Sequence, residues 1–263
     1  KTTSENRRIL QIAVPSIISN ITVPLLGLID VTIVGHLGSP AYIGAIAVGG
    51  MLFNIIYWIF GFLRMGTSGM TSQAYGQHDL NEINRLLIRS VGVGLFIALC
   101  LLILQYPILN AAFTLIQTTE EVKQLATTYF YICIWGAPAM LGLYGFAGWF
   151  IGMQNSRFPM YIAITQNIVN IIASLSFVYL LDMKVAGVAA GTLIAQYAGF
   201  FMAILLYMRY YSTLRKRIVW KDIIQKQAMY RFFRVNRDIF FRTLCLVIVT
   251  MFFTSAGAAQ GEV

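Results

Sequence analysis

Long apolar runs separated by short polar segments dominate the pattern of this chain of 263 residues. A helix needs about 20 predominantly apolar residues to cross the hydrocarbon core of a bilayer. Six runs have this length, and a seventh begins near Ile239 and continues through Ala259. The six expected spans are 9–35, 42–70, 88–112, 126–150, 159–181 and 186–208. Because apolar and polar positions do not alternate within them, the runs indicate a helical bundle and not a membrane β-barrel.

The composition identifies the broad class of protein. The chain is 58% hydrophobic and 11% charged, with a mean hydropathy of +0.72. Soluble domains carry about 25% charged residues, and a single core of this size could not bury so much apolar surface. Cys100, Cys133 and Cys245 follow no disulfide or zinc spacing, and His36 and His78 lie far apart. The sequence therefore predicts an all-α integral membrane protein without a metal site.

The basic residues predict the orientation of the bundle. The net charge is +9, but the loops on one side of the predicted spans contain only Lys123 and Lys184. The other side holds the basic N-terminus, the segment with Arg85 and Arg89, and a long basic stretch after the sixth span. An excess of Lys and Arg marks cytoplasmic loops, so we expect a cytoplasmic N-terminus. The first apolar run is also too long for the core of a cleavable signal peptide.

The longest polar stretch predicts the internal boundary. Residues 209–237 mix basic side chains with Ile, Trp and Phe, a composition typical of an amphipathic segment lying on anionic lipid headgroups. Membrane lipids explain this charge, so no nucleic-acid partner is expected. The predicted organisation is a six-helix lobe over 1–208, a cytoplasmic linker over 209–237, and a seventh helix over 238–263.

One acidic residue is expected inside the membrane. Of the ten Asp and Glu residues, only Asp30 lies well within a span, in the outer half of the first. Intramembrane ionisable residues are costly and mark functional sites. A carboxylate there can hold a proton, or ionise when it meets a cation. The alternative is a carboxylate near the helix end that reaches water at the outer interface.

Polar residues of later spans could complete such a site. Asn167, Asn170 and Ser174 follow a spacing of i, i+3 and i+7, so they share one helix face, close to Gln166. Thr192 lies among small residues that permit helices to approach closely. Such side chains can also serve only to join helices through hydrogen bonds. Together with a solitary carboxylate, they indicate a proton or cation site.

Prolines are expected to bend two of the helices. Pro15 and Pro24 lie within the first span and Pro138 within the fourth, and each removes a backbone hydrogen bond. Pro24 precedes Asp30 by less than two turns, so bending there would move the carboxylate. Arg64, in the inner half of the second span, is expected to extend to the cytoplasmic surface. The sequence contains no motif of an intramembrane enzyme.

Five segments resemble one transporter family. IAVPSIISNITVPLLGLIDVTIVGHLG resembles helix 1 of the multidrug and toxic compound extrusion (MATE) transporters, and FLRMGTSGMTSQAYGQHD resembles helix 2 with its following loop. GWFIGMQNSRFPM and VAGVAAGTLIAQYAG resemble the helix 4–5 turn and helix 6. VNRDIFFRTLCLVIVTMFFTSAGAAQGEV is similar to helix 7 of the bacterial DinF-like branch. The segments follow the order of the family along the whole chain.

The resemblance implies an architecture and a location. The family has twelve helices in two six-helix lobes, with a central cavity that opens alternately to each side of a bacterial inner membrane. This chain would be the N-terminal lobe, the linker and most of helix 7. The C-terminal lobe would then be expected from the rest of a full-length chain. The resemblance implies a secondary transporter, without enzymatic activity or cofactor.

The resemblance also implies roles for individual residues. Asp30 matches the acidic position whose protonation or sodium binding drives substrate release, and Pro15 matches a proline associated with helix bending. Asn170 and Thr192 match the asparagine and hydroxyl of the cation site. Where many members carry a second aspartate, this chain has Ser174, which removes a hard oxygen ligand that sodium would favour. Proton coupling is therefore expected in preference to sodium.

The expected function is efflux of small organic compounds, cationic or amphipathic, by cation-coupled antiport. Two alternatives stay open. A flippase for lipid-linked precursors would need basic residues in its cavity for pyrophosphate, and only Arg64 is available. A non-transporting, truncated lobe is the second alternative, because one lobe alone cannot enclose a pathway with two openings.

Overall fold

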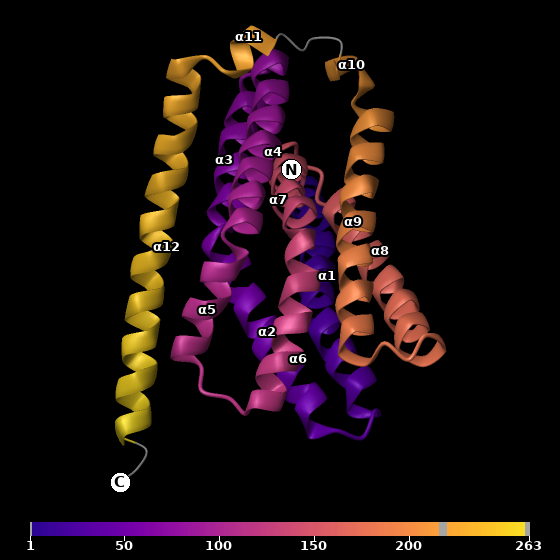
Figure 1. Cartoon of the computed structure of the whole chain (residues 1–263). Coiled ribbons are helices and arrows are strands. Elements are labelled where there is room, and N and C mark those ends of the chain that lie inside the picture. Colours follow the sequence, from indigo (N-terminus) through magenta and orange to yellow (C-terminus); the bar gives the residue numbers. More distant parts are fainter. Residues whose placement is uncertain (1, 216–219, 261–263) are drawn as a thin grey trace.

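The protein is a bundle of helices that run along a common axis (Figure 1). The computed structural model describes residues 2–215 and 220–260, and no strand occurs among them. The longer elements are α1 (Thr2–Gly35), α2 (Pro40–Ile59), α3 (Phe62–Gly76), α4 (Leu80–Ile103), α5 (Gln105–Leu115), α6 (Glu120–Cys133), α7 (Ala137–Gly152), α8 (Arg157–Leu175), α9 (Lys184–Tyr210) and α12 (Lys226–Gln260). The shorter elements are η1 (Ile134–Gly136), η2 (Ser176–Leu180), α10 (Ser212–Arg215) and α11 (Trp220–Ile223). The predicted all-α class is confirmed.

Six segments are long and apolar enough to cross a membrane. They are Ile9–Gly35, Pro40–Gly76, Leu80–Ile103, Glu120–Gly152, Arg157–Leu180 and Lys184–Tyr210. Each corresponds to one of the six predicted spans, and the boundaries differ by nine residues or fewer. The predicted seventh span lies within α12 and stays a prediction.

Three of these segments contain a break that follows from the local sequence. The second turns at Phe60 and Gly61, between α2 and α3. The fourth breaks at η1, a 3₁₀ turn directly before Pro138, as expected for a residue that cannot donate a backbone hydrogen bond. The fifth ends in the π-helical turn η2.

The third predicted span is divided differently. Helix α4 ends at Ile103, because Pro107 has no N–H to donate to the carbonyl of that residue. Helix α5 then continues the run. In contrast, α1 is a continuous helix that contains both Pro15 and Pro24.

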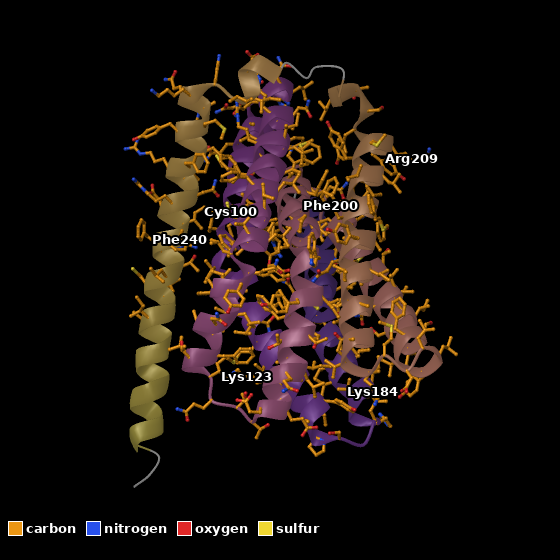
Figure 2. All side chains as sticks on the ribbon, viewed as in Figure 1. Cys100, Lys123, Lys184, Phe200, Arg209 and Phe240 are labelled. Atoms are coloured by element: carbon orange, nitrogen blue, oxygen red, sulfur yellow. The ribbon has the colours of Figure 1, made fainter. Side chains whose placement is uncertain are left out.

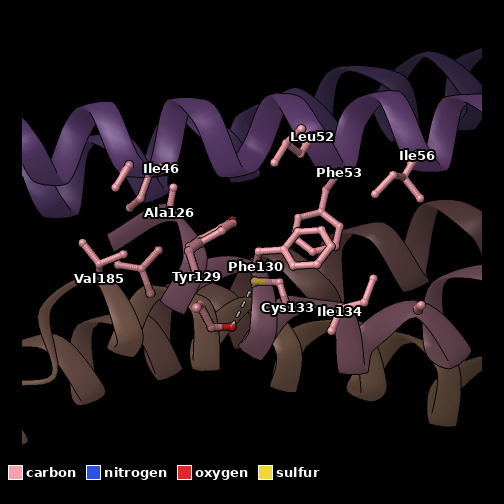
Figure 3. Packing of buried hydrophobic residues seen from close by; sticks show 14 of the residues in the cluster. Ile46, Leu52, Phe53, Ile56, Ala126, Tyr129, Phe130, Cys133, Ile134 and Val185 are labelled. Atoms are coloured by element: carbon pink, nitrogen blue, oxygen red, sulfur yellow. Dashed lines mark hydrogen bonds between the residues drawn. The ribbon is translucent and has the colours of Figure 1, made fainter. Parts of the chain in front are cut away.

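Aromatic packing forms the core at the end of the bundle where α2 and α6 meet. The rings of Phe53 and Phe130 stack with centroids 5.2 Å apart (Figure 3). Beside them, the thiol of Cys133 donates a hydrogen bond of 3.6 Å to the carbonyl of Ala189 in α9. Stacked and edge-on ring pairs stabilise a core beyond the area that they bury, so these contacts hold α2, α6 and α9 together.

A second core lies toward the end that carries α10 and α11. It includes Trp149 of α7, which is fully buried. Its indole N–H donates a hydrogen bond of 2.8 Å to the carbonyl of Ile83 in α4. This bond satisfies the polar atom of the large buried ring and joins α7 to the first turn of α4.

Helices α8 and α9 approach closely where α9 has glycine. A Cβ atom on Gly191 would lie 2.2 Å from Oγ of Ser174 and 2.8 Å from its backbone nitrogen. At Gly199, a Cβ would lie 2.6 Å from Gln166. No side chain fits at either contact, so the expectation that small residues permit close approach here is confirmed.

The segment after α9 docks on α4. Arg89, whose side chain is 2% exposed, donates hydrogen bonds to the carbonyls of Asp222 (2.9 Å) and Ile223 (2.8 Å), at the end of α11. It also pairs with Glu82 at 2.8 Å. Arg85 forms an ion pair with Asp222. The sequence places Arg85 before the third predicted span and Arg89 at its start; in the structure both lie within α4 and hold the linker.

A second contact fixes the linker at α10. The amide of Asn84 donates a hydrogen bond of 3.0 Å to the carbonyl of Leu214, and its oxygen accepts one of 2.6 Å from the hydroxyl of Tyr207. The helix α12 then begins at Lys226, within the range predicted as linker. Figure 2 places Arg209 at this end of the bundle and both Lys123 and Lys184 at the opposite end.

The close approach at Gly191 generates a first prediction. We expect Gly191→Ala to destabilise the protein by about 2 kcal/mol, because the added methyl group meets the backbone of Ser174. The measurement is thermal unfolding of the full-length protein in detergent. Gly92→Ala is the matched control, since a Cβ at Gly92 meets nothing within 4 Å. Equal unfolding temperatures for the two variants would contradict the argument.

The docked linker generates a second prediction. Arg89→Met leaves the carbonyls of Asp222 and Ile223 without their donors, and we expect a loss of about 2 kcal/mol. Faster chymotrypsin cleavage between residues 211 and 225 should accompany it. The control is Arg209→Met, an exposed residue without an ion pair in the described part of the chain. An unchanged cleavage rate in Arg89→Met would show that the linker is held by other contacts.

Candidate functional site

A buried carboxylate lies at the junction of α1, α8 and α9. Asp30 of α1 is 4% exposed. Its Oδ2 accepts a hydrogen bond of 3.0 Å from the hydroxyl of Thr192 in α9. The amide of Asn170 in α8 donates a hydrogen bond of 3.2 Å to the same hydroxyl. Three of the residues singled out in the sequence therefore form one hydrogen-bonded chain across three helices.

The two other polar residues of the predicted face, Asn167 and Ser174, are buried, but neither is hydrogen-bonded to Asp30. Ser174 is fully buried one turn after Asn170, against the backbone at Gly191. Asn167 donates hydrogen bonds to the carbonyls of Thr22 (3.1 Å) and Ala163 (2.9 Å). Asn167 thus joins α8 to α1 one turn nearer the basic end of the bundle, and it is not bonded to Asp30.

Besides Oδ1 of Asn167, three buried oxygen atoms in this region have no hydrogen-bond partner among the described residues. They are Oδ1 of Asp30, Oδ1 of Asn170 and Oγ of Ser174. Buried polar atoms are almost always paired in proteins. A carboxylate oxygen can bind a proton, and carboxylate, amide and hydroxyl oxygens are all ligands of hard cations. No group of three or more His, Cys, Asp or Glu side chains that could hold a metal ion occurs in the described residues.

A groove of about 630 Å³ opens beside Asp30, between α1, α2 and α6. Its walls are mainly apolar, with Met51, Trp58 and Tyr129 among them, and Asn54 adds an amide. Met51, Asn54 and Trp58 are exposed. Among the residues that line the groove, Asp30 is the only charged one.

Sequence reasoning missed the residues of this groove. Asn54 and Trp58 lie one turn apart in an apolar helix, and this spacing is the signal that could have shown a shared exposed face. Tyr129 carried no signal, because one tyrosine in an apolar run is usually a core residue.

A smaller cavity of about 180 Å³ lies nearer the basic end, between α1, α3, α7 and α8. Arg64, Asn20 and Gln166 line it together with Tyr144. Arg64 is exposed, and its extension to the cytoplasmic surface stays a prediction. Arg64 and Gln166 line this cavity and not the groove at Asp30, so the two spaces have different walls.

Known proteins with similar sequences occur in several organisms. The chain is 35% identical to the DNA damage-inducible protein F of Escherichia coli, over 99% of this chain and 57% of that protein. It is 28% identical to the multidrug and toxin extrusion protein 1 of Danio rerio, over 76% of this chain and 33% of that protein. The chain thus spans only about half the length of the curated relatives that it matches, or less.

Solved structures show the same fold. The structure described as the outward-facing conformation of a multidrug resistance MATE family transporter superposes with a TM-score of 0.81 at 21% identity. The match covers 94% of this chain and 55% of that one. The predicted architecture, a lobe of a MATE-type bundle, agrees with this fold.

The sequence profile of the family described as MatE matches residues 15–176. This range includes most of α1 and all of α8, and so it contains Asp30 and Asn170. The family consists of secondary transporters and not of enzymes. The chain is a multi-pass membrane protein that belongs to the MatE family, as the resemblance of its helices indicated.

Proposed function

We propose that this chain is the N-terminal lobe of an antiporter that expels small organic compounds, cationic or amphipathic, in exchange for protons. The names of its relatives support extrusion: one is a multidrug and toxin extrusion protein, and another is a probable multidrug resistance protein. The missing C-terminal lobe would form the other wall of the pathway. The distribution of basic residues supports a bacterial inner-membrane location with a cytoplasmic N-terminus.

The observation that carries the proposal is the position of Asp30. It is the only buried acidic side chain in the described residues, and it lies on the wall of the groove. The aromatic faces of Trp58 and Tyr129 and the sulfur of Met51 line the same groove. Aromatic rings attract cations, and methionine-rich surfaces adapt to different ligands. The wall therefore suits a bulky organic cation.

The hydrogen bonds of Asp30 indicate how a proton could compete with substrate. Oδ2 is occupied by Thr192, whereas Oδ1 has no partner in the described residues. A proton can therefore bind at Oδ1 while the bond to Thr192 is kept. A unit charge pair 4 Å apart contributes about 4 kcal/mol at an effective dielectric constant of 20. Neutralising Asp30 would thus weaken the binding of a cation by about a thousandfold.

The prolines of α1 give the carboxylate a means to move. Pro24 lies less than two turns before Asp30. It has no N–H to donate to the carbonyl of Asn20, so the helix is weakened there. Pro15 weakens the helix in the same way two and a half turns earlier. The hydrogen bond of Asn167 to Thr22 holds this part of α1 against α8. We propose that protonation of Asp30 lets α1 bend at these residues and release the substrate.

The oxygen ligands favour a proton over sodium. Sodium is a hard cation for which a second carboxylate would be a good ligand, and Ser174 stands at that position. Ser174 and Asn170 offer only neutral oxygens beside the single charge of Asp30. A site with one carboxylate needs only that carboxylate to bind a proton. We therefore propose H⁺ as the coupling ion and Na⁺ as the alternative.

The chemistry of the groove also argues against the flippase alternative. A lipid-linked pyrophosphate would need arginine or lysine side chains around its charge. The groove at Asp30 has none in its lining, and Arg64 lies in the separate smaller cavity. An anionic headgroup beside an uncompensated carboxylate would be repelled.

The role of Asp30 is tested with the full-length protein in everted membrane vesicles. We expect Asp30→Asn to abolish dye transport into the vesicle lumen, which corresponds to export from the cell, while the protein still elutes as a single species in size-exclusion chromatography. The variant has nearly the same shape but no charge to gain or lose. Asp182→Asn, which removes an exposed carboxylate outside the spans, should keep full activity. Normal extrusion by Asp30→Asn would refute the proposed mechanism.

The coupling ion is tested in the same vesicles. We expect dye movement to stop when the proton gradient is collapsed at constant sodium, and to be unaffected when sodium is added at constant pH. The reason is that Asp30 is the only group in the site that can change its charge. Movement driven by sodium alone would show that Asn170, Ser174 and Thr192 complete a sodium site, and it would overturn proton coupling.

A further inference from the structure

Helix α12 stands beside the six-helix bundle and leaves a groove along its length. It packs against α3 at one level, where a Cβ on Gly66 would lie 2.2 Å from Oδ1 of the buried Asn236. Figure 1 shows α12 at the side of the bundle, and two hollows lie between it and the helices α3 and α4. Both hollows are lined by Tyr230, Phe232 and Arg234, so they adjoin along α12, and together they are called the groove here.

The hollow nearest the basic end of the bundle is polar. It has a volume of about 600 Å³, and the side chains that line it come from α3, α4 and α12. Its charged residues are Asp79, Glu82, Arg89, Arg231 and Arg234.

The acidic side chains of this hollow have partners within the protein, whereas two of its arginines have no acidic partner. Glu82 is paired with Arg89 at 2.8 Å, and Asp79 accepts the hydrogen bond that begins α4. Arg231 and Arg234 are exposed, and neither pairs with an acidic side chain in the described part of the chain. The available charge of the hollow is therefore positive, and arginine is the residue that best binds phosphate oxygens, through paired hydrogen bonds.

The second hollow is mainly apolar, although Arg234, Asn236 and Arg237 also line it, and it lies farther from the basic end of the bundle. It has a volume of about 430 Å³ and is lined by Phe62, Val93, Ile97 and Phe240, among others. The rings of Phe62 and Phe240 meet edge-on, with centroids 5.8 Å apart. Since a helix rises 1.5 Å per residue, Phe240 lies about 15 Å along α12 from Tyr230. This length is about half of the roughly 30 Å hydrocarbon core of a bilayer, which is the depth of one lipid leaflet.

We propose that this groove binds one anionic phospholipid of the leaflet at the basic end of the bundle. Arg231 and Arg234 bind the phosphate, and one acyl chain lies between α12 and the bundle, against Val93 and Ile97. Charge complementarity selects this occupant, because a neighbouring transmembrane helix would not bring an anion to the two arginines. A soluble anion would leave the apolar hollow unfilled.

The lipid would connect two parts of the protein. Its headgroup is held by α12, and its chain contacts α3 and α4, on both sides of the Gly66–Asn236 contact. Binding would therefore strengthen the attachment of α12 to the six-helix bundle. This inference concerns a different surface from the groove at Asp30, and it does not depend on the direction or the coupling ion of transport.

The test uses native mass spectrometry of the full-length protein in detergent, with phosphatidylglycerol, phosphatidylcholine and inorganic phosphate as probes. We expect Arg231→Gln/Arg234→Gln to reduce the retention of phosphatidylglycerol at least tenfold, because both headgroup ligands are removed. The matched control is Arg157→Gln/Arg209→Gln, which removes the same charge from exposed residues outside the groove. Phosphatidylcholine should bind at least tenfold more weakly than phosphatidylglycerol.

A variant of the apolar hollow tests the acyl chain separately. Ile97→Trp should fill the hollow and lower phosphatidylglycerol retention without removing a charge. Size-exclusion chromatography checks that each variant is folded. Four results would overturn the proposal: an equal loss in the control pair, equal binding of phosphatidylcholine, no effect of Ile97→Trp, or displacement of the lipid by millimolar phosphate. Absence of phosphatidylglycerol from the wild-type protein would show that the other lobe occupies the groove.

Discussion

The structure depends on the burial of one carboxylate, that of Asp30, between three helices. A charged group in a membrane is costly unless it meets hydrogen-bond donors or an opposite charge. Thr192 supplies one donor to Asp30, and Asn170 fixes the hydroxyl of Thr192. This geometry requires α8 and α9 to lie close together, which the glycine at 191 allows by admitting the backbone of Ser174. The packing of two helices thus determines the environment of an acid on a third.

The two ends of the bundle are held together by different interactions. At the basic end, ion pairs and hydrogen bonds to backbone carbonyls join α4 to α10 and α11. At the opposite end, the connection between η2 and α9 is a tight turn in which Asp182 and Lys184 have positive φ. The middle, at Asp30, is held by a few hydrogen bonds and by the contacts of small residues. The basic end of the bundle is therefore joined by more ion pairs and hydrogen bonds than the region around Asp30.

Much of the fold could be predicted because its signals are local. Length and hydropathy are sufficient to find six spans, and a proline within an apolar run explains the turn before Pro138. The pairing of Asp30 with Asn170 and Thr192 was also predictable, because polar residues in apolar helices must find partners. Helix period and the resemblance to a family then indicated which residues these partners are.

Other features could not be predicted because they depend on contacts between distant segments. Nothing in the sequence around Arg89 indicates its partners. Only folding brings it to the carbonyls of α11, more than 130 positions later. The groove wall at Trp58 and Tyr129 likewise depends on which faces of α2 and α6 are left uncovered. Pro15 and Pro24 lie in a continuous helix, since a proline removes one hydrogen bond but does not by itself end a membrane helix.

The docking of α11 on α4 has a mechanical consequence. Because Arg89 binds the last two carbonyls of α11, that short helix moves as part of the six-helix bundle. Helix α12 begins at Lys226, so only residues 224 and 225 separate it from this fixed point. Any swing of α12 as a lever must therefore be taken up by the backbone torsions of two residues. Because α12 has 35 residues, a small rotation at this connection would give a large displacement at the far end of the helix.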